Sequence, residues 1–227
     1  LIFSAILSSI TTILIIPILK SFKINQIIRK EGPKKHLQKS GTPTMGGLTI
    51  VPTGIAIGLI GNTENAQLIS LSIMILMYML IGTIDDWQSL INQKNSGLKP
   101  FSKLFLQTTV SIIFLYIANI QNWIQPFINL PLGIKLLPGI LIWPLFIFVF
   151  IAESNATNLT DGLDGLASGC GALVFIGLAI KITLSGNIED TELASFCMAM
   201  AGAWLGFLVH NRNPAKIFMG DAGSLAM

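Results

Sequence analysis

Apolar residues run along this 227-residue chain in long, unbroken stretches, separated by short polar connections. A helix needs about 20 apolar residues to cross about 30 Å of bilayer hydrocarbon. We therefore predict an all-α polytopic membrane protein, a single transmembrane domain over residues 1–227 with about seven spans and the start of an eighth. The predicted spans are about 1–19, 45–61, 67–84, 104–120, 136–152, 166–183 and 193–209.

Composition agrees with a bilayer environment. Hydrophobic residues make up 52% of the chain and charged residues only 11%, whereas soluble domains carry about 25% charged residues. The two cysteines, Cys170 and Cys197, lie in apolar runs without metal-ligand spacing. We expect them to serve packing, and we expect neither a disulfide framework nor a zinc site.

Basic residues predict the orientation of the chain. Of the 14 Lys and Arg residues, only Lys135 and Lys181 fall in connections on one predicted face, and the other 12 share the opposite face. By the positive-inside rule that face is cytoplasmic and the amino terminus lies outside. The 12 residues are Lys20, Lys23, Arg29, Lys30, Lys34, Lys35, Lys39, Lys94, Lys99, Lys103, Arg212 and Lys216.

Aspartates gather on the same predicted face. Charge at a bilayer centre costs about 2.5 to 3.5 kcal/mol, so acids near helix ends need a reason. Wet helix ends would explain any one of them, but less readily five that are far apart in sequence. Carboxylates beside lysines are typical of magnesium-assisted phosphate chemistry. The five are Asp85, Asp86, Asp161, Asp164 and Asp221, and Asp190 falls on the other face.

Three polar segments on this face strengthen that interpretation. Lys39-Ser-Gly-Thr-Pro-Thr-Met-Gly-Gly47 follows His36 and is either a ligand-approaching glycine loop or a simple helix entry. Asn155–Gly165 is polar and turn-prone after an apolar span, and its two aspartates share a face if a helix begins there, where they could merely complement its dipole. In His210–Ser224, a Gly-Asp turn places a carboxylate beside a predicted helix start.

Together these segments resemble a known family. His36 with the Lys39–Gly47 stretch, Asp85-Asp86, Asn158-Leu-Thr-Asp-Gly-Leu-Asp-Gly-Leu166 and Phe218-Met-Gly-Asp-Ala-Gly-Ser224 resemble, in order, the motifs of the phospho-N-acetylmuramoyl-pentapeptide transferases (MraY), which are glycosyltransferase 4 family enzymes. The resemblance implies a ten-helix homodimer in the bacterial inner membrane. It also implies Mg²⁺-dependent transfer of phospho-MurNAc-pentapeptide from UDP-MurNAc-pentapeptide to undecaprenyl phosphate, giving lipid I and UMP. No nucleic acid is expected as a partner.

The resemblance also implies roles for individual residues. Asp85, Asp86 and Asp221 would be catalytic, with Asp85 as the base on the lipid phosphate. Asp221 and Asn158 would bind the metal. Substrate-binding positions would be His36, Lys39, Lys103, Asp161, Asp164, Asn211 and Phe218.

Two departures from the family pattern matter. Ser89 stands where many relatives carry a lysine, which puts one phosphate contact in question. The family also continues past the fourth motif into further helices, so we expect the chain as given to be inactive by itself.

Two other functions share some of these features. A sister enzyme that transfers GlcNAc-1-phosphate to the same lipid shares the aspartates but lacks the Gly-Thr-Pro-Thr-Met-Gly-Gly stretch. A secondary transporter would carry its acids near the bilayer midplane, whereas here they lie at one face and only Glu153 lies well within a span end.

Overall fold

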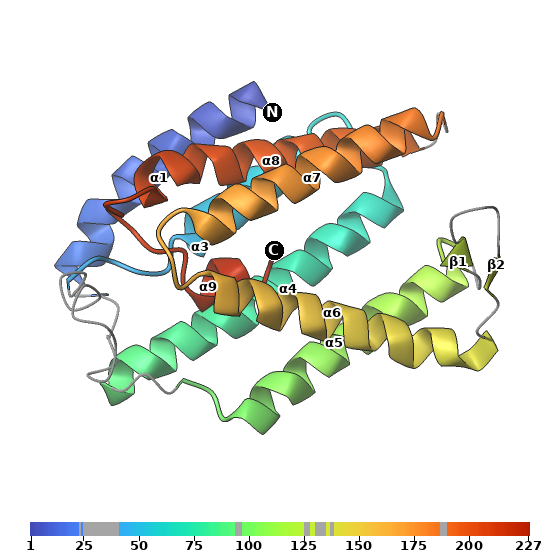
Figure 1. The fold of residues 1–227 in the computed structure, drawn as a ribbon, viewed down its shortest axis with the longest axis horizontal. Coiled ribbons are helices and arrows are strands. Elements are labelled where there is room, and N and C mark those ends of the chain that lie inside the picture. The colour runs from blue at the N-terminus through green and yellow to red at the C-terminus, as the bar shows by residue number, and fades with distance from the viewer. Residues whose placement is uncertain are drawn as a thin grey trace.

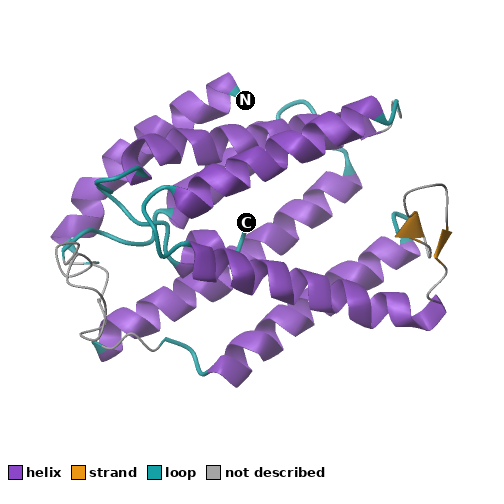
Figure 2. Cartoon of the chain, viewed as in Figure 1, coloured by secondary structure: helices purple, strands orange, loops and turns teal. Residues whose placement is uncertain are grey.

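The described part of the protein is mainly helical (Figures 1 and 2). The computed structural model describes residues 1–22, 24, 41–93, 97–124, 128–129, 135–136, 139–186 and 190–227. Two short strands, β1 and β2, pair antiparallel with Ile128 opposite Leu136. The elements are α1 Ile2–Ser21, α3 Gly47–Gly58, α4 Ala66–Asn92, α5 Pro100–Ile120, β1 Ile128–Asn129, β2 Lys135–Leu136, η2 Gly139–Leu141, α6 Ile142–Thr160, α7 Leu166–Leu184, α8 Thr191–Asn211 and α9 Asp221–Ser224.

Six of the described helices are long and apolar enough to cross a membrane, which confirms the predicted all-α polytopic class. The predicted second span is shorter than expected, because α3 has only 12 residues. At 1.5 Å per residue it is about 18 Å long, less than the hydrocarbon thickness. Past its carboxyl end, Gly61 adopts a positive φ of 82° and turns the chain toward α4.

Helix α8 is the centre of the bundle and packs against α1, α3 and α7. Its large side chains Trp204 and Phe207 are fully buried. Gly202 and Gly206 lie directly against the backbone of α1, where a Cβ atom would overlap carbonyl oxygens. Small residues that allow close backbone approach are the usual basis of helix packing in membranes.

The boundaries of α6 differ from the prediction of a span over 136–152 followed by a polar loop. The helix runs from Ile142 through Thr160, so the Asn- and Thr-rich segment continues it. Its polar side chains bond to the preceding turn, as Asn155 does to the Ile151 carbonyl at 2.8 Å and Thr157 to that of Glu153 at 2.6 Å. Side chains satisfied in this way allow the helix to extend beyond its apolar part.

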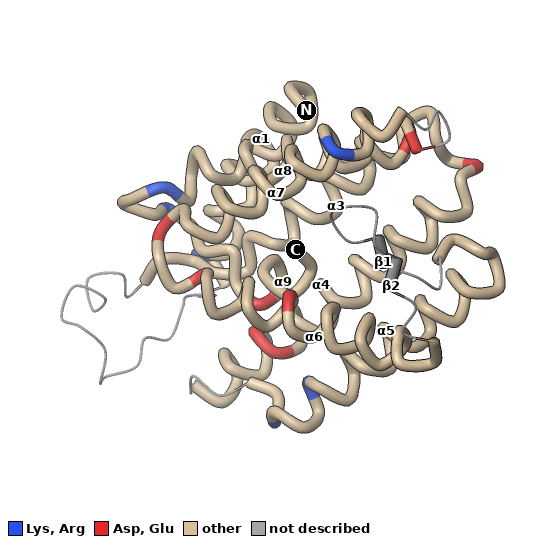
Figure 3. The backbone as a smooth tube through the Cα atoms, turned by 45° about the vertical axis from the view of Figure 1, so that its right-hand side comes forward, with Lys and Arg blue, Asp and Glu red and all other residues tan. Residues whose placement is uncertain are grey.

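Helix ends that carry chemistry meet at one end of the bundle. The carboxyl ends of α4, α6 and α8 lie there with the amino ends of α3, α5 and α7, as the alternating spans predict. Figure 3 shows acidic positions gathered beside α4, α6 and α9. The short helix α9 packs against α3, α4 and α6 at this end, so it lies among the predicted site residues.

Candidate active site

Helix α9 places the Asp221 carboxylate at the centre of the site. Gly220 precedes it with a φ of 71°, a conformation that glycine adopts without strain. Gly82 of α4 and Gly47 of α3 touch the α9 backbone, and a Cβ atom on Gly82 would overlap the Asp221 carbonyl oxygen. The predicted Gly-Asp turn before a helix is confirmed, and two glycines from other helices seat it.

Asp221 joins two helices through its two carboxylate oxygens. Lys103 of α5 donates from Nζ to Oδ2 at 2.6 Å, and Asn158 of α6 donates from Nδ2 to Oδ1 at 2.7 Å. The Asn158 amide nitrogen also reaches the Ser224 hydroxyl at 2.9 Å. Charged, well-directed hydrogen bonds of this kind are the strong ones in proteins, so α5, α6 and α9 are held at Asp221.

The aspartates of the pair in α4 have different surroundings. Asp85 faces the Lys103 ammonium, with its Oδ1 at 3.8 Å from Nζ, and accepts a hydrogen bond from the Leu98 amide at 3.1 Å. Asp86 instead accepts from the Ala222 amide of α9 at 3.1 Å. Asp85 therefore shares a cation with Asp221, whereas Asp86 anchors the α9 backbone.

Asp161 and Asp164 lie in the turn between α6 and α7. Helix α7 begins at Leu166, where the predicted span over 166–183 begins, after Gly165 at a φ of 77°, so the two aspartates precede the helix and do not share a face of it. Asp164 accepts a hydrogen bond from the Ala215 amide at 3.3 Å. Burial raises the pKa of Asp161 to about 8; the Gly220 amide opposes the rise, and the charges of Asp221 and Asp164 add to it.

Asp161→Asn should make the protein less sensitive to high pH. Asp161 keeps its proton in the folded state up to about pH 8, whereas an unfolded chain loses it above about pH 4. Folding therefore loses stability as pH rises through this window, and the amide does not titrate. We expect the melting temperature of Asp161→Asn, relative to the parent, to be higher at pH 9 than at pH 5. An equal difference at both pH values would contradict this.

Asn211 and Phe218 hold the loop that leads to α9. Buried Asn211 accepts from the Gly165 amide at 3.0 Å and donates to the Ile217 carbonyl at 2.9 Å. The backbone of Phe218 pairs with the segment before α3, donating to the Pro43 carbonyl at 2.8 Å and accepting from the Gly46 amide at 2.9 Å. These contacts bring the first, third and fourth motifs together, and roles in substrate binding stay predictions.

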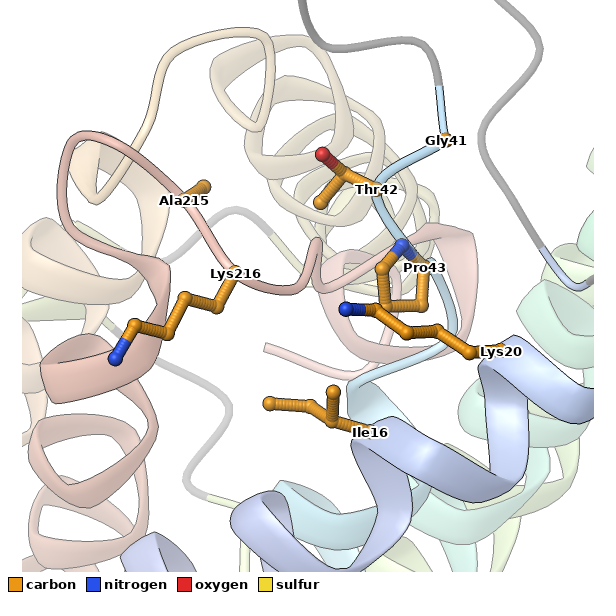
Figure 4. Close-up of a pocket in the computed structure, with 7 residues that line it drawn as sticks. All are labelled: Ile16, Lys20, Gly41, Thr42, Pro43, Ala215 and Lys216. Carbon is orange, nitrogen blue, oxygen red and sulfur yellow. The ribbon is translucent and has the colours of Figure 1, made fainter.

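A cavity of about 380 Å³ opens beside this loop (Figure 4). Ala215 and Lys216 of the loop face the segment Gly41–Pro43, and Ile16 and Lys20 of α1 close one side. The described residues that line it include two lysines and no carboxylate, so they favour anions. None of the predicted catalytic aspartates lines this cavity, which therefore neighbours the acidic cluster without enclosing it.

Two predicted substrate-binding residues, His36 and Lys39, lie outside the described residues. The other predicted positions, from Asp85 to Asp221, come from five helices and the connections after α6 and α8, and they meet at one end of the bundle. Ser89 lies one turn beyond Asp85 in α4. Its effect on phosphate binding stays a prediction.

The oxygen atoms of these side chains are of the kind that a hard divalent cation prefers as ligands. Asp85 and Asp221 present carboxylate oxygens around the single ammonium of Lys103, and magnesium commonly takes one or two carboxylates plus substrate phosphates and waters. Within the described ranges, no three His, Cys, Asp or Glu side chains are grouped to hold a metal by themselves. Asn158 turns its amide nitrogen to Asp221, so its oxygen could bind a metal only after the amide rotates.

Sequence reasoning missed the supporting residues Gly82 and Gln107. Both lie inside predicted spans, where a glycine or one polar residue does not form a motif. Gln107 follows Lys103 by four residues and so lies on the same face of α5. This spacing of four residues from Lys103 was the feature of the sequence that could have identified Gln107.

Comparisons with known proteins agree with the motifs. Residues 39–51 match a signature described as phospho-N-acetylmuramoyl-pentapeptide-transferase signature 1. A protein of that name from Prochlorococcus marinus (strain MIT 9313) is 61% identical over 215 residues, which cover 93% of this chain and 58% of the relative. Another from Synechococcus sp. (strain CC9311) is 56% identical over 230 residues, which cover the whole chain and 62% of the relative.

The chain spans about three fifths of the length of these relatives. The family model described as glycosyl transferase family 4 matches residues 68–227. That range holds Asp85, Lys103, Asn158 and Asp221, whose side chains meet in the structure. The chain belongs to glycosyl transferase family 4.

Proposed function

We propose that the whole protein transfers phospho-MurNAc-pentapeptide from UDP-MurNAc-pentapeptide to undecaprenyl phosphate, giving lipid I and UMP. The observation that carries this proposal is the convergence of Asp85 and Asp221 on the Lys103 ammonium at one end of a membrane bundle. The match of residues 39–51 to the signature of the pentapeptide transferases supports this donor over UDP-GlcNAc.

In this proposal Asp85 accepts the proton of the lipid phosphate. The lipid phosphate oxygen then bonds to the sugar-linked phosphorus of the donor, and the bond to the UMP oxygen breaks. Asp85 is half-buried and faces Lys103, so it can reach a phosphate held by that ammonium. A base must lie within hydrogen-bond reach of the proton that it takes.

Asp221 and Lys103 keep the lipid phosphate aligned with the diphosphate of the donor. Asp221, Asp85 and Asn158 would hold Mg²⁺, which would neutralise phosphoryl charge during the displacement. Lys103, held beside Asp221 and Asp85, would contact the diphosphate oxygens. Asp86 keeps α9 in place through the Ala222 amide.

The remaining predicted residues bind the donor in this proposal. Asp161 and Asp164 lie in the turn between α6 and α7, and Asn211 and Phe218 lie at the end of α8 and in the loop before α9. Together they take the uridine and ribose, with His36 and Lys39 on the segment that precedes α3. The positive-inside distribution of lysines supports a cytoplasmic active face in the bacterial inner membrane. We also propose that the whole protein forms a homodimer.

The proposal is tested with the full-length protein purified in detergent. We expect UMP release with UDP-MurNAc-pentapeptide only when undecaprenyl phosphate and Mg²⁺ are both present. Replacing the donor with UDP-GlcNAc is the matched control. UMP release with UDP-GlcNAc but not with UDP-MurNAc-pentapeptide would assign the sister activity. UMP release with neither donor would refute both transferase activities.

A further inference from the structure

A second row of hydrogen bonds lies one helical turn behind the Lys103–Asp221–Asn158 contacts. Gln107 of α5 donates from Nε2 to the Ser154 hydroxyl of α6 at 3.2 Å. Ser154 in turn donates to the Leu225 carbonyl, at the end of α9, at 2.9 Å. This second row therefore joins the same three helices as the first.

The two rows are related by helical periodicity. Gln107 follows Lys103 by four residues, Ser154 precedes Asn158 by four, and Leu225 follows Asp221 by four. Residues four apart lie above one another on a helix face. The residues of the second row thus lie one turn deeper on the same three elements, with Gln107 bonding to α6 where Lys103 bonds to α9.

Gln107 connects the second row to two adjacent positions of α6. Its Oε1 atom accepts a hydrogen bond from Asn155 at 2.9 Å, in addition to the bond that it donates to Ser154. The side chains of Gln107 and Ser154 are buried, with exposed fractions of 0% and 5%. The buried amide of Gln107 thus donates one hydrogen bond to α6 and accepts one from it. Together these two bonds fix the rotation of α6 about its axis and its position along that axis relative to α5.

We propose that Gln107 is a positioning residue, which holds Lys103 and Asn158 at Asp221 by fixing α5, α6 and α9 one turn behind them. This inference rests on the proposed function. Misplacing a reacting group by about 1 Å can cost about 100-fold in rate. Loss of the second row should therefore lower turnover, while Asn211 and Phe218, which are held by contacts outside this row, keep the donor bound.

Gln107→Met removes both bonds with little change in volume, and Ser154→Ala breaks the row at α9. Folding should survive, because Asn155 keeps its bond to the Ile151 carbonyl. In the full-length protein we expect kcat to fall at least about tenfold in both variants, with both substrate KM values within about twofold of the parent.

Ser111→Ala is the matched control. Ser111 is buried on α5 one turn beyond Gln107 and bonds to Tyr78 of α4 at 2.8 Å, without reaching α6 or α9. We expect it to lower the melting temperature about as much as Gln107→Met and to keep kcat. A kcat in Gln107→Met equal to that of Ser111→Ala would overturn the proposal.

A double-mutant cycle tests whether Gln107 acts through Lys103. In a Lys103→Arg background, Gln107→Met should lower kcat by less than about threefold, and an undiminished loss would overturn the proposal. Melting temperatures of the same four proteins give a second cycle without any activity, in which we expect the two shifts to be less than additive. A parent protein without transferase activity would refute the proposed function alone, and this second cycle would still decide on Gln107.

Discussion

Asp221→Asn is expected to lower kcat by at least about 100-fold in the full-length protein. The amide has nearly the same shape as the carboxylate, but it lacks the negative charge that pairs with the Lys103 ammonium at 2.6 Å. It is also a much weaker ligand for a divalent cation. Losses of this size are typical when one preorganised electrostatic group of an active site is removed.

The measurement is UMP release under saturating substrates, together with the melting temperature. Asp190→Asn is the matched control, because Asp190 directly precedes α8 and the site lies at the carboxyl end of that helix, 21 residues away. We expect the control to keep parental turnover. A folded Asp221→Asn protein with more than about one tenth of parental kcat would remove Asp221 from the proposed mechanism.

Gly82→Ala is expected to inactivate the protein through geometry alone. The added methyl group would overlap the carbonyl oxygen of Asp221, and that neighbour is backbone, which cannot rotate away. Helix α9 must therefore shift from α4 and carry Asp221 with it. Overpacking typically costs about 1 to 3 kcal/mol of stability, and a displacement of about 1 Å costs about 100-fold in rate.

Gly177→Ala provides a control of identical chemistry. Gly177 lies within α7, and nothing is within 4 Å of the position that its Cβ would take. Alanine is favoured over glycine inside a helix by about 1 kcal/mol, so the control should keep activity and melt no lower than the parent. Equal activity in the Gly82 and Gly177 variants would show that α9 tolerates displacement.

The sequence predicted most residues of the candidate site but few of their contacts. Lys103 and Asp221 are 118 positions apart, and their ion pair depends on how α5 and α9 pack. The boundary of α6 was misplaced because Asn, Ser and Thr favour turns in isolation. In the folded protein, Gln107, Ser224 and the preceding helical turn bond to them and keep the segment helical.

The sequence by itself determined the membrane class, the approximate positions of the six long spans and the gathering of the predicted site residues at one end of the bundle. Those properties follow from the length, apolarity and charge of each segment, because each segment must match the bilayer on its own. Only the tertiary structure decided that Asp85 shares Lys103 with Asp221, that Asp86 anchors α9 instead, and that Gly82 and Gln107 support the site. Close packing and hydrogen bonds between helices are properties of pairs of residues distant along the chain, and no local pattern of polar and apolar positions encodes them.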